Sequence, residues 1–549
     1  MKTAKIMTVI NLTFLVSILS ILRIIIGAAN NPPGFTYLAV GHYYLDYFEY
    51  LQQTAQGVMG HWTVLNQFAT DDPTKTILGW GQYLIIGKIA KIFHLSAITG
   101  YWFGVFFLVF FFSLSIYFII KRLLPNLNFF YQLSAWFFCL FAAPFFKIEV
   151  NNGISKIVPY DFWYAPMSFF HRFGGIPHHL STGILTVIIL LMSANIFDRL
   201  KTEVLSKIIW KIIAVIGLLL TLLTFGPLQV INIISSIFLV GIIFCIKNKP
   251  SKNLAYFLIL IVLFILPMAW LIKISHDNGS LFQRINIWEV SQENHPGLLS
   301  IILTTGPILI FALLGLRRFF KDISNIRWIL LFYVISSYLF FSTSLARFFG
   351  TFNSRFLSGS VYVLFGTLAI LGVIEIADWF GKRKKILTIS LILLLLAYFF
   401  WITTMIYQSF GSVDQASYLP NSIYNGMQFL GNQSDKRAVL TTPDKYFGVV
   451  VPVFADKNVY IARPMFTPDF QNRLNIADRF FRGDMDPSEA KKFVNDNKIG
   501  FVFITFMENY QPKNLDKYLF LNKIYDKEGV IIFKVVLNSY SSKKVKVPF

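Results

Sequence analysis

A series of long apolar runs, separated by short polar segments, is the feature that most constrains the fold of this chain. Each run has close to the roughly 20 residues that a helix needs to cross a bilayer. Backbone groups in lipid must be hydrogen-bonded within helices or closed barrels, so such runs indicate membrane-spanning helices. We predict an all-α polytopic membrane bundle of about eleven transmembrane helices, in the ranges 1–28, 97–120, 129–146, 180–197, 208–224, 228–246, 253–273, 298–316, 328–344, 358–379 and 385–407.

The composition supports lipid as the solvent for much of the chain. Hydrophobic residues make up 55% and charged residues only 14%, whereas soluble proteins carry roughly 25% charged residues. The net charge of +21 would suggest a nucleic-acid partner in a soluble protein. Here most of the basic excess lies in short segments between apolar runs, which is typical of membrane topology. We therefore expect a lipid bilayer as partner and no nucleic acid.

The basic residues also predict an orientation. If the N-terminus is cytoplasmic, alternate connections should be rich in Lys and Arg. Five connections fit this rule: 121–122, 199–211, 247–252, 317–327 and 382–385. The outer loops are then 29–96, 147–179, 274–297 and 345–357, and the stretch 408–549 is extracytoplasmic. We expect a multi-pass plasma-membrane protein whose transmembrane domain is 1–407.

Three smaller features qualify this prediction. The first run follows Lys2 and Lys5 and resembles a signal peptide, but no clear cleavage site follows, so we interpret it as an uncleaved anchor. The segment 76–93 is shorter and carries two lysines, which favours the membrane interface. Cys139 and Cys245 lie inside apolar runs, and their spacing indicates neither a disulfide framework nor a metal site.

The extracytoplasmic stretch has the pattern of a small α/β domain. A helix is expected over 416–430, because Gly431 is a plausible stop signal. A second helix should open at Asp486-Pro487, which combine a capping residue with proline at the first helical position. Strands are expected at 437–442, 458–462, 499–505 and 530–536.

The polar segment 41–62, in the first outer loop, is where we place the candidate catalytic residues. Asp46 and Glu49 are three residues apart, which places them on one face of a helix. His42 lies about one turn before Asp46, and Tyr50 about one turn after it. A carboxylate pair here would supply a catalytic base. The alternative is an amphipathic loop helix whose acidic residues only keep it in water.

Several segments of the predicted outer loops and tail form a pattern when taken together: Asp46-Tyr47-Phe48-Glu49-Tyr50, 56–62, Thr70-Asp71, 451–460, Thr467 and 480–484. This pattern resembles the GT-C superfamily of integral-membrane glycosyltransferases. The resemblance implies a membrane bundle that uses a polyprenyl-phosphate-linked sugar. It also implies that an acid in the first outer loop is the base. This sequence has Asp-x-x-Glu rather than Asp-x-Asp, so Asp46 is the first candidate and Glu49 the second.

The fourth outer loop offers groups for the phosphate of such a donor. Arg347 and Arg355 both lie in 345–357, and a guanidinium matches phosphate with two parallel hydrogen bonds. Arg355 is the stronger candidate because it directly precedes the next apolar run. The alternative is a set of interfacial arginines that only anchor helices.

The second outer loop contains further polar candidates. His171, Arg172 and His178 are expected to shape an acceptor or pyrophosphate pocket, or to lie at a wet interface. A zinc site is disfavoured because no His-x-x-x-His pair is present. A divalent cation, Mg²⁺ or Mn²⁺, held by Asp46, Asp161 and a donor phosphate is an open alternative to a site without any cofactor.

Two other outer-loop features have a functional and a structural interpretation. Trp288, in the third outer loop, would stack on a sugar, whereas tryptophans at lipid interfaces commonly form an aromatic belt. Asp71 and Asp72 precede Pro73 and are typical of a turn, although the pair is also a second candidate for the base.

The expected function is that of a cell-envelope glycosyltransferase. It would move a hexosyl or pentosyl group from a polyprenyl-phosphate donor to a lipid, glycan or protein acceptor on the extracytoplasmic face. One alternative is a transporter or flippase for a lipid-linked glycan, but transporters usually place ionisable groups at mid-membrane. The other is a non-catalytic GT-C-like membrane protein.

Overall fold

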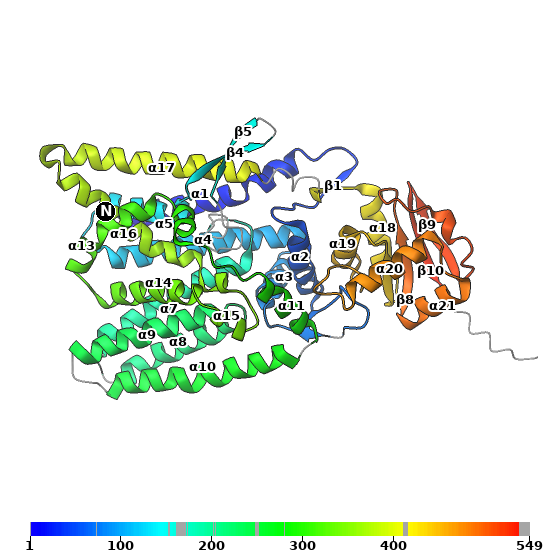
Figure 1. Ribbon diagram of the computed structural model, residues 1–549, viewed down its shortest axis with the longest axis horizontal. Helices are drawn as coiled ribbons and strands as arrows, with labels where there is room; N and C mark the ends of the chain where they lie inside the picture. The colour runs from blue at the N-terminus through cyan, green and yellow to red at the C-terminus, as the bar shows by residue number, and fades with distance from the viewer. Residues whose placement is uncertain are drawn as a thin grey trace, which may run out of the picture.

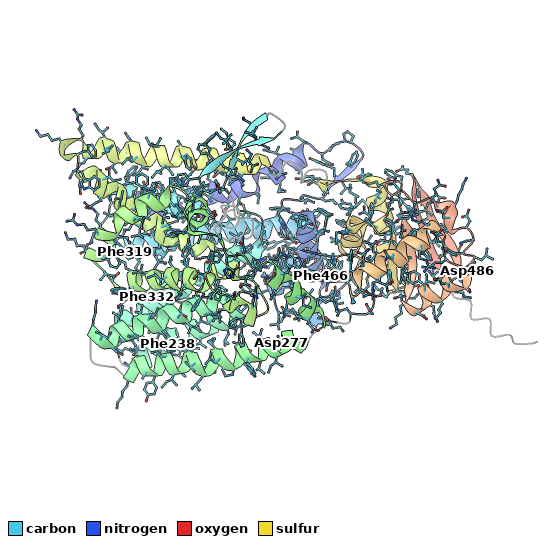
Figure 2. All side chains as sticks on the ribbon, viewed as in Figure 1. Phe238, Asp277, Phe319, Phe332, Phe466 and Asp486 are labelled. Carbon is cyan, nitrogen blue, oxygen red and sulfur yellow. The ribbon has the colours of Figure 1, made fainter. Side chains whose placement is uncertain are left out.

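The computed structural model describes residues 2–72, 74–151, 154–160, 172, 174–200, 203, 205–247, 252–278, 280–409 and 416–536. A bundle of roughly parallel and antiparallel helices forms one part of the elongated molecule, and a small domain with a β-sheet forms the other (Figure 1). Phe319 lies in the bundle far from this domain, Asp486 lies within it, and Phe466 lies where the two parts meet (Figure 2).

Within the described part of the chain, eight helices are long and apolar enough to cross a membrane. They are α1 (Lys2–Ala29), α4 (Ala97–Leu123), α7 (Pro177–Arg199), α8 (Leu205–Leu223), α9 (Pro227–Lys247), α10 (Lys252–Asn278), α16 (Tyr362–Asp378) with the preceding 3₁₀ turn η2 (Gly359–Val361), and α17 (Lys384–Ser409) after η3 (Gly381–Arg383). These apolar helices confirm the prediction of a mostly helical, multi-pass membrane protein.

The expected number of eleven full-length spans is wrong. A ninth span is obtained only if α12 (Leu298–Thr305) and α13 (Ile308–Lys321) are counted together, and these two helices meet at 90°. The break lies at Gly306-Pro307, where Gly306 has a φ of 85° and a Cβ would lie 1.9 Å from the Ala143 carbonyl oxygen. Only glycine accepts both this backbone conformation and this close approach.

The other two apolar runs form shorter helices inside the bundle. The helix α5 (Phe129–Phe141) has 13 residues and packs against α4 and α16. It ends before Pro144, after which the chain enters the antiparallel pair β4 (Phe146–Asn151) and β5 (Ile154–Pro159). The helix α14 (Asn325–Phe341) has 17 residues and packs against α7 and α9. Apolar length overestimated α5, whereas α14 has the expected length but begins and ends three residues earlier than predicted.

The end of the bundle next to the C-terminal domain carries short helices from several loops (Figure 1). These are α2 (Tyr44–Met59), α3 (Gly81–Ile92), α11 (Ser280–Ser291), α15 (Leu345–Phe348) and η1 (Asn353–Phe356), together with the short pair β2 (Val64–Leu65) and β3 (Lys75–Thr76). Gly57 and Gly87 allow α2 and α3 to touch, because a Cβ on Gly87 would lie 2.1 Å from the Thr54 carbonyl oxygen. The N-terminus lies at the opposite end of the bundle.

The C-terminal domain is built on a mixed four-stranded sheet in the order β7-β8-β10-β9, in which β7 and β8 are parallel and the other pairs antiparallel. Its elements are α18 (Asn421–Gly431), β7 (Ala438–Thr441), α19 (Lys445–Ala455), α20 (Phe470–Arg482), α21 (Pro487–Asp496), β8 (Ile499–Ile504), η5 (Pro512–Leu515), β9 (Leu521–Lys527) and β10 (Val530–Val535). The expected strands at 437–442, 499–505 and 530–536 and the helix at Pro487 are present.

Three details of this domain differ from the sequence prediction. The helix expected from 416 begins at Asn421, because β6 (Tyr418–Pro420) pairs with β1 (Phe35–Tyr37) of the first outer segment. The strand expected at 458–462 contributes only a single bridge, between Val459 and Val439. The strand β9 was not anticipated, because its sequence is largely polar.

The apolar core does not stop at the domain boundary. One cluster of buried residues runs from the bundle through α2 into α18, α19 and the inner face of the sheet. A second, smaller cluster lies between the sheet and α20 and α21. The C-terminal domain is therefore packed onto the end of the bundle opposite the N-terminus, and this contact forms one side of the site described next.

Candidate active site

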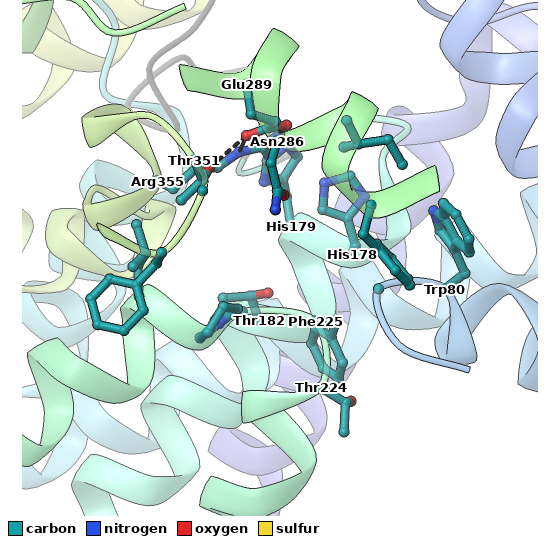
Figure 3. A pocket seen from close by; sticks show the side chains of 18 of the residues that line it. Trp80, His178, His179, Thr182, Thr224, Phe225, Asn286, Glu289, Thr351 and Arg355 are labelled. Atoms are coloured by element: carbon teal, nitrogen blue, oxygen red, sulfur yellow. Dashed lines mark hydrogen bonds and ion pairs between the residues drawn. The ribbon is translucent and has the colours of Figure 1, made fainter. Parts of the chain in front are cut away.

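A cavity of about 300 Å³ lies between the C-terminal domain and the end of the bundle that this domain contacts. Its lining comes from α2, α3, the first turn of α7, the α8–α9 turn, α10, α11, the segment 349–359 and the C-terminal residues Arg463, Met465 and Phe466. In Figure 3, Arg355, Thr351 and Glu289 lie on one side of the space and Trp80 and His178 on the other. Polar and apolar side chains both face this cavity.

The acidic wall of the cavity comes from α2. Asp46 and Glu49 both line it, as their spacing on one helical face predicts. Their surroundings differ, because the Asp46 side chain is 31% exposed whereas that of Glu49 is 8% exposed. Asp46 is therefore the more accessible of the two to a molecule in the cavity.

Arg463, between α19 and α20 of the C-terminal domain, joins these two carboxylates. Its Nη2 donates to Asp46 Oδ1 at 2.5 Å, and its Nη1 donates to Glu49 Oε2 and to the Leu45 carbonyl oxygen. The side chain is only 6% exposed. Sequence analysis missed Arg463. The available signal was an arginine directly after the predicted strand 458–462, but nothing in the sequence links it to α2.

Several hydrogen bonds fix the loop that carries Arg463. The Thr467 hydroxyl donates to the Phe68 carbonyl oxygen at 2.7 Å and accepts from the Ala462 backbone N–H at 3.1 Å. The Asn66 amide donates to the Phe466 carbonyl oxygen at 3.0 Å. The segment between α2 and α3 therefore holds the Arg463 loop at two residues that follow the arginine, Phe466 and Thr467.

Burial controls the protonation of this cluster. Burial raises the pKa of Glu49 to about 7, although the nearby Arg463 favours the ionised carboxylate, and Asp46 adds to the increase. Burial alone would lower the pKa of Arg463, but Glu49 and Asp46 outweigh it and raise that pKa. Arg463 therefore stays charged while Glu49 is close to the point where it takes up a proton.

The basic wall of the cavity is formed by Arg355 on η1. Its Nη2 donates to Glu289 Oε1 at 2.7 Å and its Nε to Glu289 Oε2 at 3.3 Å, so α11 holds the guanidinium in a two-pronged contact. The Thr351 hydroxyl also donates to Glu289, at 2.6 Å (Figure 3). The Arg355 side chain is 36% exposed. Burial lowers its pKa, but Glu289 outweighs this and raises it, with smaller contributions from Tyr50 and Asp46.

His178 lies in the first turn of α7 and lines the cavity. The Tyr83 hydroxyl lies 2.7 Å from His178 Nδ1, and the Tyr83 ring stacks on Tyr50 with centroids 4.7 Å apart. His179 lies beside it, with ring centroids 4.2 Å apart. The imidazole is therefore fixed by aromatic neighbours at the cavity wall.

Trp288 also lines the cavity, from α11. It belongs to a wider aromatic and aliphatic lining. The other large apolar side chains are those of Trp80, Leu223, Phe225, Leu228, Ile272, Phe282, Ile285, Phe349, Leu357 and Phe466. This lining suits the faces of a sugar ring and the first units of an apolar chain better than a highly charged polymer.

Two predicted binding residues lie outside the cavity lining. Arg347 is 60% exposed and forms an ion pair with Glu293. Arg172 is fully buried, lies 3.8 Å above the Tyr362 ring, and donates to the carbonyl oxygens of Cys139, Leu140 and Ala142, the end of α5 and the residue after it. It satisfies helix-end carbonyls that would otherwise be unpaired. Neither arginine therefore lies among the residues that line this cavity.

The remaining predicted residues fall into two groups. Asp161 and His171 lie outside the described residues. Asp71 pairs with Arg473 and Asp72 with Arg284, both at 2.5 Å, and neither aspartate lines the cavity. The alternative that this pair supplies the base is therefore not supported by their position.

The carboxylate pair does not fit a divalent cation as it stands. Within the described ranges, no three His, Cys, Asp or Glu side chains gather closely enough to ligate a metal ion. One oxygen of each carboxylate, Asp46 Oδ1 and Glu49 Oε2, is already bound to Arg463. A positively charged guanidinium at that position opposes a second cation through charge repulsion.

Comparisons with known proteins rest on structure. The sequence matches no family model, and it matches no curated protein. The fold is similar to that of the oligosaccharyltransferase AglB from Archaeoglobus fulgidus, solved with an inhibitory peptide and a dolichol-phosphate. The TM-score is 0.51 at 13% identity, over 99% of this chain and 75% of that one.

Two bacterial structures show the same similarity. ArnT from Cupriavidus metallidurans, bound to undecaprenyl phosphate, matches with a TM-score of 0.51 at 9% identity, over 97% of this chain and 98% of that one. The arabinofuranosyltransferase AftD from Mycobacteria matches with a TM-score of 0.51 at 10% identity, over 97% of this chain but only 40% of that longer one. Over nearly its whole length, this chain has the fold of the GT-C membrane glycosyltransferases.

Proposed function

We propose that this protein is a membrane glycosyltransferase that moves a sugar from a polyprenyl-phosphate donor to an acceptor hydroxyl or amide on the extracytoplasmic face. The observation that carries the proposal is one cavity lined by both an accessible carboxylate, Asp46, and a fixed guanidinium, Arg355. The shared fold supports the reaction class, and two of the solved structures with this fold contain a polyprenyl-type phosphate.

Asp46 is the proposed base. It would take the proton of the acceptor as the acceptor atom forms its bond to the anomeric carbon. Its Oδ1 is bound to Arg463, and its side chain is exposed to the cavity. Glu49 is less suited to this step, because its side chain is almost completely buried.

Arg355 is the proposed phosphate ligand. As the bond between the anomeric carbon and the phosphate oxygen breaks, the electron pair stays on the phosphate, and a fixed guanidinium stabilises the added charge. Glu289 and Thr351 hold the Arg355 fork in one orientation. Preorganised charge of this kind needs little rearrangement during the reaction.

The lipid part of the donor fits the position of the cavity in the bundle. The cavity is also lined by Ile272 of α10 and by residues 223–228 at the α8–α9 turn. The helices α8, α9 and α10 are all long and apolar enough to cross a membrane. A phosphate headgroup at the end of the bundle would therefore leave its apolar chain beside membrane-spanning helices. His178 and Trp288, which line the same cavity, are proposed contacts for the sugar or acceptor.

We place the N-terminus in the cytoplasm and the cavity and C-terminal domain, residues 408–549, outside. The N-terminus and the turn between α16 and α17, which carries Lys382, Arg383, Lys384 and Lys385, lie at the end of the bundle far from the C-terminal domain (Figure 1). A basic end of the bundle is the cytoplasmic end under the positive-inside rule.

A transporter is less well supported by the positions of charge. The ion pairs between described residues lie in loops and near helix ends, as in Arg122–Asp198 and Arg318–Glu375. Transport pathways usually need ionisable groups near mid-membrane. The polar groups of the cavity are gathered at one end of the bundle instead, which suits chemistry at the membrane surface.

The direct test is turnover by the purified full-length protein in detergent or liposomes. Labelled polyprenyl-phosphate sugars, hexosyl and pentosyl, are incubated with extracts of lipid, glycan and peptide acceptors. Labelled product should form with the wild type and not with Asp46→Asn. Product formation by both proteins at equal rates would contradict the assignment of Asp46. Movement of donor across liposomes without any product would favour the flippase.

A further inference from the structure

We infer that Arg463 is a resident cation of the Asp46–Glu49 carboxylate pair, supplied by the C-terminal domain in place of a divalent metal ion. The position between the two carboxylates is a natural one for Mg²⁺ or Mn²⁺, which prefer oxygen ligands. Here a guanidinium fills that position. The catalytic part of this inference rests on the proposed transferase function, whereas the cation site itself does not.

The guanidinium of Arg463 is shared between two carboxylates. One terminal nitrogen of Arg463 binds Asp46 and the other binds Glu49, so the two carboxylates share a single positive charge. Two carboxylates one helical turn apart repel each other when both are ionised, and this repulsion grows with burial. A buried cation between them removes that repulsion and fixes both side chains.

The same contact leaves one oxygen of Asp46 available. Arg463 binds Oδ1, and no described residue donates a hydrogen bond to Oδ2. The Asp46 side chain is also the more exposed of the pair. Arg463 thus acts as a positioning residue that holds Asp46 with its second oxygen available to an acceptor in the cavity.

Attachment of the C-terminal domain alone does not account for Arg463. Other contacts already fasten this domain to the first outer segment away from the cavity, including Arg473 with Asp71 and Gln67 with Asp456. Arg463 differs from Arg473 because both of its carboxylate partners line the cavity. The pair Arg473–Asp71 therefore provides a matched control for the loss of an interdomain ion pair.

The inference predicts that removing Arg463 creates a metal site. In Arg463→Ala, the two carboxylates lose their cation, and the removed guanidinium leaves space that a hydrated divalent ion can enter. The measurement is binding of Mn²⁺ alone to the purified full-length protein, detected by electron paramagnetic resonance. Arg463→Ala should bind Mn²⁺ with a dissociation constant of roughly 10⁻⁴ M, typical of weak oxygen-ligand sites. This binding should be absent in the wild type, in Arg473→Ala and in the double variant Arg463→Ala/Asp46→Asn.

Activity provides a second, separate measurement. Wild-type turnover should survive EDTA. Arg463→Ala should lose about 100-fold in kcat, comparable to the loss of one preorganised donor, with a smaller change in the acceptor KM. Added guanidinium or Mn²⁺ should restore about tenfold of that loss through the same charge-assisted contacts. Arg473→Ala should lower the unfolding temperature but keep turnover within about threefold, as for an ion pair outside the site.

The outcomes separate the two proposals. Mn²⁺ binding to the wild type, or loss of wild-type turnover in EDTA, would overturn the resident-cation inference while leaving the transferase intact. Equal loss in Arg463→Ala and Arg473→Ala, without rescue or Mn²⁺ binding, would show a role in attachment only. If no donor supports turnover, the Mn²⁺ measurement still decides the cation site. If Arg463→Ala does not fold, Arg463→Lys is tested in its place. That variant should retain partial turnover and bind no Mn²⁺. Mn²⁺ binding to Arg463→Lys would contradict the inference.

Discussion

Two arginines on opposite sides of the cavity bind carboxylates in different ways. Arg463 divides its two terminal nitrogens between Asp46 and Glu49, and its side chain is nearly buried. Arg355 directs two nitrogens to the single carboxylate of Glu289, and about a third of its side chain stays exposed. The first arginine neutralises two acids, and the second keeps an accessible positive charge.

Two similar ion pairs can therefore have separate roles in one site. A guanidinium that shares its charge between two carboxylates has little charge left for a ligand, so Arg463 suits the positioning of Asp46. A guanidinium with one carboxylate and an exposed edge can accept a phosphate on its remaining N–H groups. Under the proposed function, α2 would therefore supply the catalytic base and η1 the phosphate ligand.

The largest effect should come from Asp46→Asn. An amide cannot accept the acceptor proton, so kcat should fall roughly 10²- to 10⁴-fold, the usual contribution of a general base. The affinity for the donor should change little, because Arg355 is untouched. Steady-state turnover and donor binding, measured on the same preparation, check both statements. A variant that keeps more than a tenth of wild-type kcat would break the assignment of the acid side.

Arg355→Ala should have the next largest effect. Removing a fixed donor to developing charge typically costs about 10²- to 10³-fold in rate, and here donor binding should weaken as well. Arg355→Lys keeps the positive charge without the planar guanidinium and should retain part of the activity that Arg355→Ala loses. Binding of a non-transferable polyprenyl phosphate and kcat/KM for the donor are the measurements. Unchanged donor affinity in Arg355→Ala would remove η1 from the phosphate site.

Glu49→Gln should change how stability depends on pH. Burial raises the pKa of Glu49 to about 7, above the ordinary value near 4.3. Protonated Glu49 therefore contributes fully to the free energy of unfolding below about pH 4. This contribution is lost as the pH rises through about 7, by up to roughly 3 kcal/mol for a shift of this size. The variant, which cannot ionise, should lack this decline.

Thermal unfolding of the full-length protein at several values between pH 5 and pH 8 measures the effect of Glu49. The surface variant Glu489→Gln, whose side chain is 45% exposed, serves as control and should follow the wild-type curve. Parallel curves for wild type and Glu49→Gln would mean that Glu49 does not titrate in this range. That result would weaken the contrast between a buried and an accessible carboxylate on α2.

The smallest effect should come from Arg347→Ala. Arg347 lies outside the cavity lining and is 60% exposed, although the side chain of its partner Glu293 is only 3% exposed, so its loss should affect stability rather than the reaction. Turnover and donor affinity should stay within about threefold of the wild type. A loss as large as that in Arg355→Ala would show that the phosphate site extends across α15 and that the comparison of two arginines is incomplete.

The sequence predicted the broad architecture because that architecture depends on local composition. Apolar runs indicated the long helices and the mostly helical bundle, and cap and strand patterns indicated most of the C-terminal α/β elements. The failures arose where a non-local contact decided the structure. Pairing of β6 with β1 shortened the helix expected from 416, and the close approach of Gly306 to Ala143 accompanies the bend of 90° in one apolar run.

For the candidate site, helix periodicity was enough to place Asp46 and Glu49 on one helical face, because this periodicity is a local property. Arg355 was also identified from sequence, because of its position between a polar loop and an apolar run. Which of these groups contact one another depends on the folded chain. Arg463 reaches Asp46 across 417 positions of sequence, and Arg172 turns inward to bind helix-end carbonyls rather than face the cavity. Such choices follow from packing and from the need to pair buried charges, and these depend on residues distant in the chain.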